Sequence, residues 1–145
     1  MPRFNGRGKI GRDESGVAAL EFALLAPAFL MLAFAIIIFA FYFSAVIGVR
    51  QAASEGARAA MAGLSTAERT SLATARAQQV IQGYGTLLSA GGTGAQVTAQ
   101  SIGTGVFQVQ VSYDISRSPF MRFSGFVPIP AGPIVSSVVV TNGSY

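Results

Sequence analysis

The chain has 145 residues, of which 51% are hydrophobic and 11% are charged, and its formal net charge is +4. It is too short for two large globular domains, and it has too few charges for an ordinary soluble surface. There is no Cys and no His, and the only Lys is Lys9. This composition excludes thiol nucleophiles, Ser-His-Asp triads, disulfides and nearly every zinc site. We therefore predict a protein that is not an enzyme and that binds no cofactor or metal.

Residues 1–16 are predicted to form a basic, flexible leader. Four basic side chains in this stretch outnumber two acidic ones: Arg3, Arg7, Lys9 and Arg12 against Asp13 and Glu14. Basic arms occur in nucleic-acid-binding proteins and beside membrane spans. Because this arm is rich in Gly and directly precedes an apolar stretch, we interpret it as a contact for anionic membrane lipid and predict no nucleic-acid partner.

Residues 17–49 are predicted to form a transmembrane helix. From Phe22 to Val49 about 28 consecutive residues carry no charge, more than the ~20 that cross a hydrocarbon core of ~30 Å. The apolar core of a signal peptide has only about 7–15 residues, so we expect this segment to be retained. Four basic residues precede the segment and about three follow it closely, which favours a cytoplasmic N-terminus.

The helix is predicted to continue to about residue 62, beyond the membrane. Pro27 lies inside it, removes one backbone hydrogen bond and is expected to bend it. Further along, small residues recur at helical spacing and form a smooth face that another helix could approach closely: Ala53, Gly56, Ala57 and Ala60. A helix of about 45 residues would be roughly 68 Å long, about twice the membrane thickness.

Residues 63–145 are predicted to form a small α+β domain. Ser65–Glu68 has the pattern of a capping box, which would begin a second helix that ends near Gln82. Apolar and polar residues alternate from Phe107 to Tyr113, as in a half-buried strand, and flanking strands are expected at 96–102 and 134–141. We expect the second helix to pack on a three-stranded, mainly antiparallel sheet.

An irregular segment, residues 116–133, separates the last two predicted strands. It carries aromatic residues between 120 and 126 and four prolines. Two interpretations remain open for the aromatic residues. They either form an exposed patch for adhesion or for a partner, or fold back to cover the thin sheet.

Glu21 is unusual because it is a carboxylate at the edge of the apolar span. At the bilayer centre a carboxylate costs about 2.5–3.5 kcal/mol, so Glu21 needs a partner or a shallow position. One interpretation is that it lies in the headgroup layer and interacts with the helix dipole. The other is that a protease cuts after Gly16, giving Val17 a free ammonium group one helical turn from Glu21.

At these residues the sequence resembles a known family. A basic leader, Gly16, four small or apolar residues, Glu21-Phe22, a nearby proline and a long apolar helix together look like a prepilin. The downstream segment Glu55-Gly56-Ala57-Arg58 is similar to the segment that follows the membrane helix in TadE-like pseudopilins of the tight-adherence (Tad/Flp) pilus system. Many of those proteins carry a second acidic residue along the helix, but here the corresponding stretch, 38–41, is fully apolar.

The resemblance implies a minor pilin or pseudopilin that takes part in assembling a pilus for surface attachment, adhesion and biofilm formation. It further implies processing at Gly16, Val17, Glu21 and Phe22 by a prepilin peptidase. Expected partners are other pilin and pseudopilin subunits, the inner-membrane pilus assembly platform and membrane lipid. Glu21 and residues 53–60, including Glu55 and Arg58, are the expected assembly contacts, although Glu55 and Arg58 could equally form only a surface pair.

The expected location is the bacterial inner membrane, crossed once, with the C-terminal domain in the periplasm and possible incorporation into the extracellular pilus. The alternative is an uncleaved membrane scaffold or adhesin whose periplasmic domain binds envelope partners or surfaces.

Overall fold

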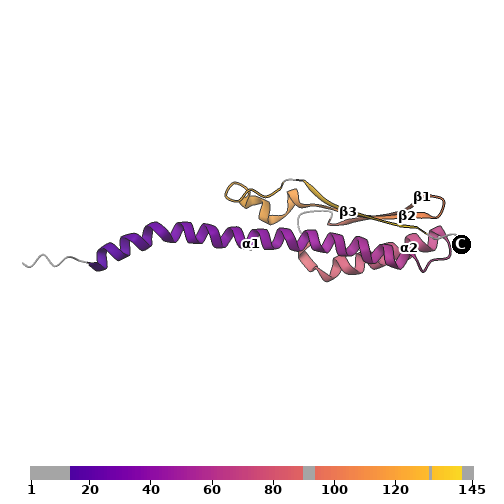
Figure 1. Cartoon of the computed structure of the whole chain (residues 1–145), viewed down its shortest axis with the longest axis horizontal. Coiled ribbons are helices and arrows are strands. Elements are labelled where there is room, and N and C mark those ends of the chain that lie inside the picture. The colour runs from indigo at the N-terminus through magenta and orange to yellow at the C-terminus, as the bar shows by residue number, and fades with distance from the viewer. Residues whose placement is uncertain (1–13, 90–93, 131, 142–145) are drawn as a thin grey trace, which may run out of the picture. The chain divides into compact units, whose positions relative to one another are not determined.

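The fold is α+β, as predicted. The computed structural model describes residues 14–89, 94–130 and 132–141 (Figure 1). Two helices and three strands make up its regular structure: α1 (Glu14–Ala60), α2 (Thr66–Gly83), β1 (Gln96–Gly103), β2 (Val106–Asp114) and β3 (Pro133–Thr141). Three short 3₁₀ helices join them: η1 (Gly85–Leu87), η2 (Ile115–Arg117) and η3 (Pro119–Phe123). Most of the predicted leader lies outside the described residues.

The chain divides into two compact units, Met1–Phe34 and Ala35–Tyr145, and α1 contributes to both. In the N-terminal unit, the described side chains from Gly16 onward are exposed, except for the half-buried Ala26. The large aliphatic and aromatic side chains of α1 from Val17 to Ile37 are between 50% and 72% exposed. By length and composition, α1 is a helix that could cross a membrane.

The predicted capping box begins α2. The Ser65 hydroxyl accepts a hydrogen bond from the Glu68 backbone N–H at 3.2 Å, and the Glu68 carboxylate accepts one from the Leu64 N–H at 2.9 Å. The first bond satisfies a backbone donor that the first turn of a helix leaves unpaired, and the second ties the residue before the N-cap to that turn. The Gly63 carbonyl also accepts a hydrogen bond from the Arg69 side chain at 2.9 Å, which ties the turn between the helices to α2.

The sheet has the order β1-β2-β3, and both neighbouring pairs are antiparallel. A short turn joins β1 to β2, with Gly105 in the left-handed region at φ 71°. Central strand β2 shows the predicted alternation, because four of its side chains are buried on one face: Phe107, Val109, Val111 and Tyr113. The predicted positions of all three strands are confirmed to within about one residue.

The second half of α1 belongs to the core of the C-terminal unit. Its small residues between Ala45 and Ala60 pack against α2 and against the buried side chains of β2. Figure 1 shows α1 and α2 beside each other along the sheet. The sequence predicted only α2 on the sheet, so the contribution of α1 is an addition to that expectation.

The aromatic segment after β2 packs mainly on α1. Val127 and Ile129 are buried against Ile38, and the ring of Phe120 stacks on Phe41 with centroids 5.5 Å apart. Phe126, in contrast, remains 78% exposed. The segment therefore covers part of a helix and also leaves an apolar surface, so each of the two sequence interpretations describes part of it.

We predict that Gly56→Val destabilises the C-terminal unit. A Cβ atom at Gly56 would lie 3.0 Å from the Ala73 carbonyl oxygen and 3.2 Å from both the Ala77 Cβ and a Val109 methyl group. Overpacking of this kind costs about 1–3 kcal/mol, to be measured by denaturant unfolding of the full chain in detergent. Gly83→Val is the matched control because a Cβ there meets no atom within 4 Å. Equal stability of the two variants would contradict the close approach of α1 and α2.

Candidate functional site

The predicted processing residues lie in the first turns of α1. Gly16, Val17, Glu21 and Phe22 are all exposed, and the helix begins at Glu14, two residues before Gly16. A Cβ at Gly16 would meet no atom within 4 Å. The described fold therefore gives no packing reason for glycine at this position. Whether the chain is cut there stays a prediction.

Helix α1 continues through Pro27 without a break in its α-helical conformation. A proline inside a helix removes one hydrogen bond, and neighbouring residues usually absorb the change by a local bend. Pro27 is exposed, so no described side chain of the N-terminal unit encloses it. The bend predicted from the sequence stays a prediction.

The small-residue face of α1 is occupied by the chain's own elements. Ala53, Ala57 and Ala60 are at most 1% exposed, and Gly56 is buried where α1 approaches α2 and β2. Intramolecular packing thus accounts for the size of these side chains. A contact between these residues and a neighbouring subunit stays a prediction without support from this geometry.

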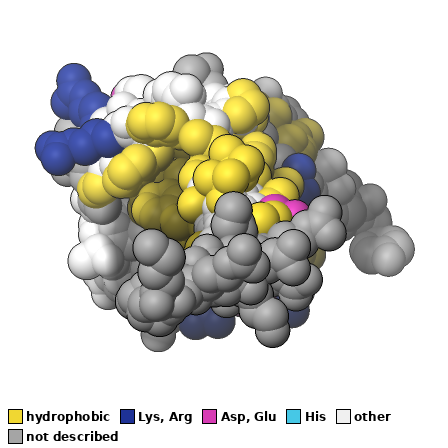
Figure 2. Space-filling view, turned by 90° about the vertical axis from the view of Figure 1, so that its left-hand side faces the viewer, with side chains coloured by type: hydrophobic (Ala, Val, Ile, Leu, Met, Phe, Trp, Pro, Cys, Tyr) yellow, Lys and Arg dark blue, Asp and Glu magenta, His cyan; other side chains and the backbone are white. Residues whose placement is uncertain are grey.

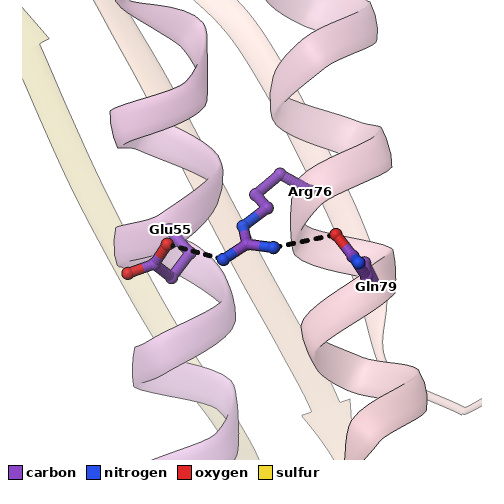
Figure 3. Close-up of polar contacts among 3 residues, drawn as sticks. All are labelled: Glu55, Arg76 and Gln79. Carbon is purple, nitrogen blue, oxygen red and sulfur yellow. Dashed lines mark hydrogen bonds and ion pairs between the residues drawn. The ribbon is translucent and has the colours of Figure 1, made fainter.

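Glu55 bonds to the second helix. Its carboxylate Oε2 lies 3.2 Å from Nη2 of Arg76, whose Nη1 donates a hydrogen bond to the Gln79 side chain at 2.8 Å (Figure 3). The side chains of Glu55 and Arg76 are 26% and 44% exposed, respectively. The pair therefore links α1 to α2 at the rim of the contact made by Gly56. The sequence analysis considered only Arg58 as a partner for Glu55 and did not identify Arg76.

Arg58 lies in the last turn of α1 and is exposed. A cation at this end of a helix interacts favourably with the helix dipole, by about 0.3–1 kcal/mol. Within the Glu55–Arg58 segment the roles are therefore divided. Glu55 and the small residues make contacts inside the chain, while the Arg58 side chain is directed to the surface.

A second small-residue contact lies about two turns before Gly56, nearer the membrane segment. A Cβ at Gly48 would be 2.9 Å from the Leu88 side chain and 3.1 Å from the Tyr84 ring. Sequence reasoning missed this contact. The signal was present, because Ala45, Val49 and Ala52 extend the small-residue spacing backward along the same helix.

Two titratable groups stand at the end of β2. Burial raises the pKa of Tyr113, so its phenol stays neutral within the core. Hydrogen bonds from Ser116 keep the pKa of Asp114 below its ordinary value, and one of them, from the Ser116 backbone N–H, measures 2.9 Å. Asp114 thereby caps η2 and fixes the direction in which the chain leaves the sheet.

Among the residues described, no three His, Cys, Asp or Glu side chains gather as a metal site.

Comparison with known proteins identifies one family. Residues 16–58 match the family model described as TadE-like protein, so the predicted resemblance is confirmed over this segment. The matched stretch begins at the glycine of the predicted cut and ends at Arg58, and it contains the whole apolar part of α1. No match was found among the curated proteins or among the solved structures.

We predict that the Glu55–Arg76 pair contributes little to stability. Ion pairs with this exposure contribute about 0.2–1 kcal/mol, so a double-mutant cycle with Glu55→Gln and Arg76→Gln should give a coupling below about 1 kcal/mol. The measurement is denaturant unfolding of the full chain in detergent. Arg58→Gln is the control, since it leaves the pair intact. A coupling above about 2 kcal/mol would mean that the pair is a main link between the helices.

Proposed function

We propose that this chain, which matches the TadE-like family over residues 16–58, is a minor pilin or pseudopilin that helps to assemble a Tad/Flp-type pilus for surface attachment. The family match is the observation that carries this proposal. A helix that is long and apolar enough to cross a membrane, with its apolar side chains exposed, supports it. The family consists generally of structural, pilin-like proteins rather than enzymes, so the mechanism is assembly.

The first proposed step is insertion and processing. The N-terminus stays in the cytoplasm and the C-terminal unit enters the periplasm, in the orientation favoured by the basic residues before the span. A prepilin peptidase then cuts the bond between Gly16 and Val17. The cut leaves an ammonium group on Val17, four residues and about one helical turn before Glu21. Both positions are exposed and therefore accessible to a second protein.

The second proposed step is transfer from lipid into a filament. In the membrane, lipid covers the exposed apolar side chains from Val17 onward. In the filament, helices of neighbouring pilin and pseudopilin subunits would replace that lipid. The two apolar environments are similar, so the exchange gains little free energy from the hydrophobic effect alone. Energy must come from an ATPase at the inner-membrane assembly platform, which other proteins supply.

We predict that Gly16→Val blocks processing and leaves a full-length precursor in the membrane. A branched side chain would obstruct a peptidase site that accepts glycine, whereas nothing in the fold obstructs it, since a Cβ at Gly16 meets no atom within 4 Å. The size of the protein on a denaturing gel and the mass of its N-terminal peptide measure the cut. Gly83→Val is again the control, and it should be processed normally. Mature-sized Gly16→Val protein would mean that the cut lies elsewhere. A wild-type protein of full-length size would instead support the uncleaved-scaffold alternative.

We predict that Glu21→Ala leaves membrane insertion intact and abolishes incorporation into pili. Removing the carboxylate makes the helix more apolar, so insertion is unchanged or improved. If Glu21 neutralises the Val17 ammonium of a neighbour, the variant buries that charge unpaired at a cost of several kcal/mol. Glu21→Gln, which keeps the shape without the charge, should fail in the same way. The measurement is the amount of protein in membranes and in sheared pili, and normal piliation in both variants would reduce Glu21 to a helix-start residue.

A further inference from the structure

A basic and aromatic surface lies on the segment that follows β2. Arg117 and Arg122 are both exposed. The exposed Asp114, directly before this stretch, interacts electrostatically with Arg117, and no acidic residue follows it up to Gly132. Phe123 is 41% exposed and Phe126 is 78% exposed on the same segment. We call residues 117–126 the basic–aromatic segment. Figure 2 shows hydrophobic side chains gathered on one face of the molecule, with basic and some acidic side chains at its margin.

The segment is held at a defined level of α1. Val127 and Ile129, which follow it directly, are buried against Ile38, and Phe120 within it stacks on Phe41. Prolines at 128 and 130 limit the conformations of the chain at this contact. The segment therefore contacts α1 at residues 38–41, and its depth in a membrane would be that of this part of the helix.

This level coincides with the outer end of a span of minimal length, which is shorter than the 17–49 predicted from the absence of charge. About 20 helical residues cross the hydrocarbon core, so a span that begins at Val17 ends near Ile36, and one that begins at Phe22, just past Glu21, ends near Phe41. The span cannot extend much further, since α2 and a sheet whose outward side chains are mostly polar pack on α1 from Ala45 onward. The aromatic rings and arginines thus lie where hydrocarbon gives way to headgroups.

We propose that the basic–aromatic segment docks on the headgroup layer of the periplasmic leaflet, with Phe123 and Phe126 in contact with the acyl boundary and Arg117 and Arg122 on lipid phosphates. This proposal rests on the proposed function only in requiring that α1 crosses the membrane. The occupant is an anionic phospholipid surface, because both charged side chains within residues 117–126 are arginines, which outnumber the neighbouring Asp114, and the exposed apolar side chains have the character of interfacial anchors. Both arginines also line one open depression together with Ser116 and Ser118, which a phosphate group could enter.

The backbone of the segment is suited to this depth. Its turns close their own hydrogen bonds, from Met121 N–H to the Ser118 carbonyl at 3.0 Å, from Ser124 to Met121 at 3.1 Å and from Phe126 to Phe123 at 2.9 Å. A polar backbone group without a partner is costly near hydrocarbon. Because these donors are satisfied internally, that cost is lower when the segment approaches the acyl boundary.

The test uses the fact that the sequence contains no Trp. Three full-length single-tryptophan variants are reconstituted in vesicles of phosphatidylcholine and phosphatidylglycerol, with or without lipids brominated at a shallow or a deep acyl position. Phe126→Trp reports on the proposed anchor, and at 78% exposure this position has room for the larger ring. Leu30→Trp, 67% exposed, reports on the span. Ile102→Trp, 49% exposed at the end of β1, is the matched control away from the membrane.

The proposal expects shallow brominated lipid to quench Phe126→Trp, deep lipid to quench Leu30→Trp, and neither to quench Ile102→Trp. An unquenched Phe126→Trp beside a quenched Leu30→Trp overturns the docking and leaves the membrane span intact. If Leu30→Trp is also unquenched, the span fails, and the proposed function fails with it. Quenching of Phe126→Trp that changes when protein is diluted in lipid would instead identify a contact between copies of the chain and would overturn lipid docking.

The arginines are tested in the Phe126→Trp background. Replacing both Arg117 and Arg122 with Gln should lower the ratio of docked to undocked segment by roughly fivefold per arginine in anionic vesicles. The effect should largely disappear in vesicles of phosphatidylcholine alone. Equal quenching with and without the arginines in anionic vesicles would contradict the phosphate contacts.

Discussion

One face of α1 sets how closely the rest of the C-terminal unit can approach that helix. The residues on this face are Gly or Ala at most positions from Ala45 to Ala60, and a Cβ at Gly56 alone would press on the backbone oxygen of Ala73 at 3.0 Å. Because the side chains are so small, α2 and β2 pack almost directly on the helix backbone. The same helix carries large, exposed apolar side chains nearer its N-terminus. A single helix thus supplies both a membrane-compatible surface and part of a folded core, and the sheet would be thin and one-sided without it.

The elements predicted well from the sequence are those with local signals. Ser65 and Glu68 begin α2 through contacts within four residues, and the alternation in β2 identifies its buried face without any knowledge of its neighbours. The role of α1 in the core could not be read in the same way. Its apolar composition satisfies lipid and protein interior equally, so hydropathy alone does not separate the two. The change from large to small residues beyond Phe43 is what separates the part of α1 exposed to lipid from the part packed in protein. This change can be interpreted only when the surface that packs on the small residues is known.

The candidate site was predictable to the extent that its contacts are local. The sequence placed Glu55 on an exposed edge of α1 and suggested Arg58 as its partner, three residues away. The structure gives it Arg76, which is 21 residues away and reaches Glu55 only because α2 folds back along α1. The predictions for Gly16, Val17 and Phe22 are of another type than the prediction for Glu55, because their predicted role depends on a peptidase and on neighbouring subunits. One chain by itself contains no surface on which those predictions could be checked, and the match to TadE-like proteins is what supports them.

The two carboxylates of α1 illustrate how environment decides what a charge can do. Glu55 is partly exposed and paired, so its loss changes the stability of one chain by a small amount. The Glu21 carboxylate forms no ion pair or hydrogen bond with another described residue and lies at the edge of an apolar stretch. In a membrane the headgroup layer can solvate it. Under the proposed assembly that layer is left behind, and desolvation would make the charge costly unless a counter-charge replaces the water and headgroups. The Val17 ammonium exists only after the cut, so the electrostatics of Glu21 would make cleavage a condition for stable entry into the filament.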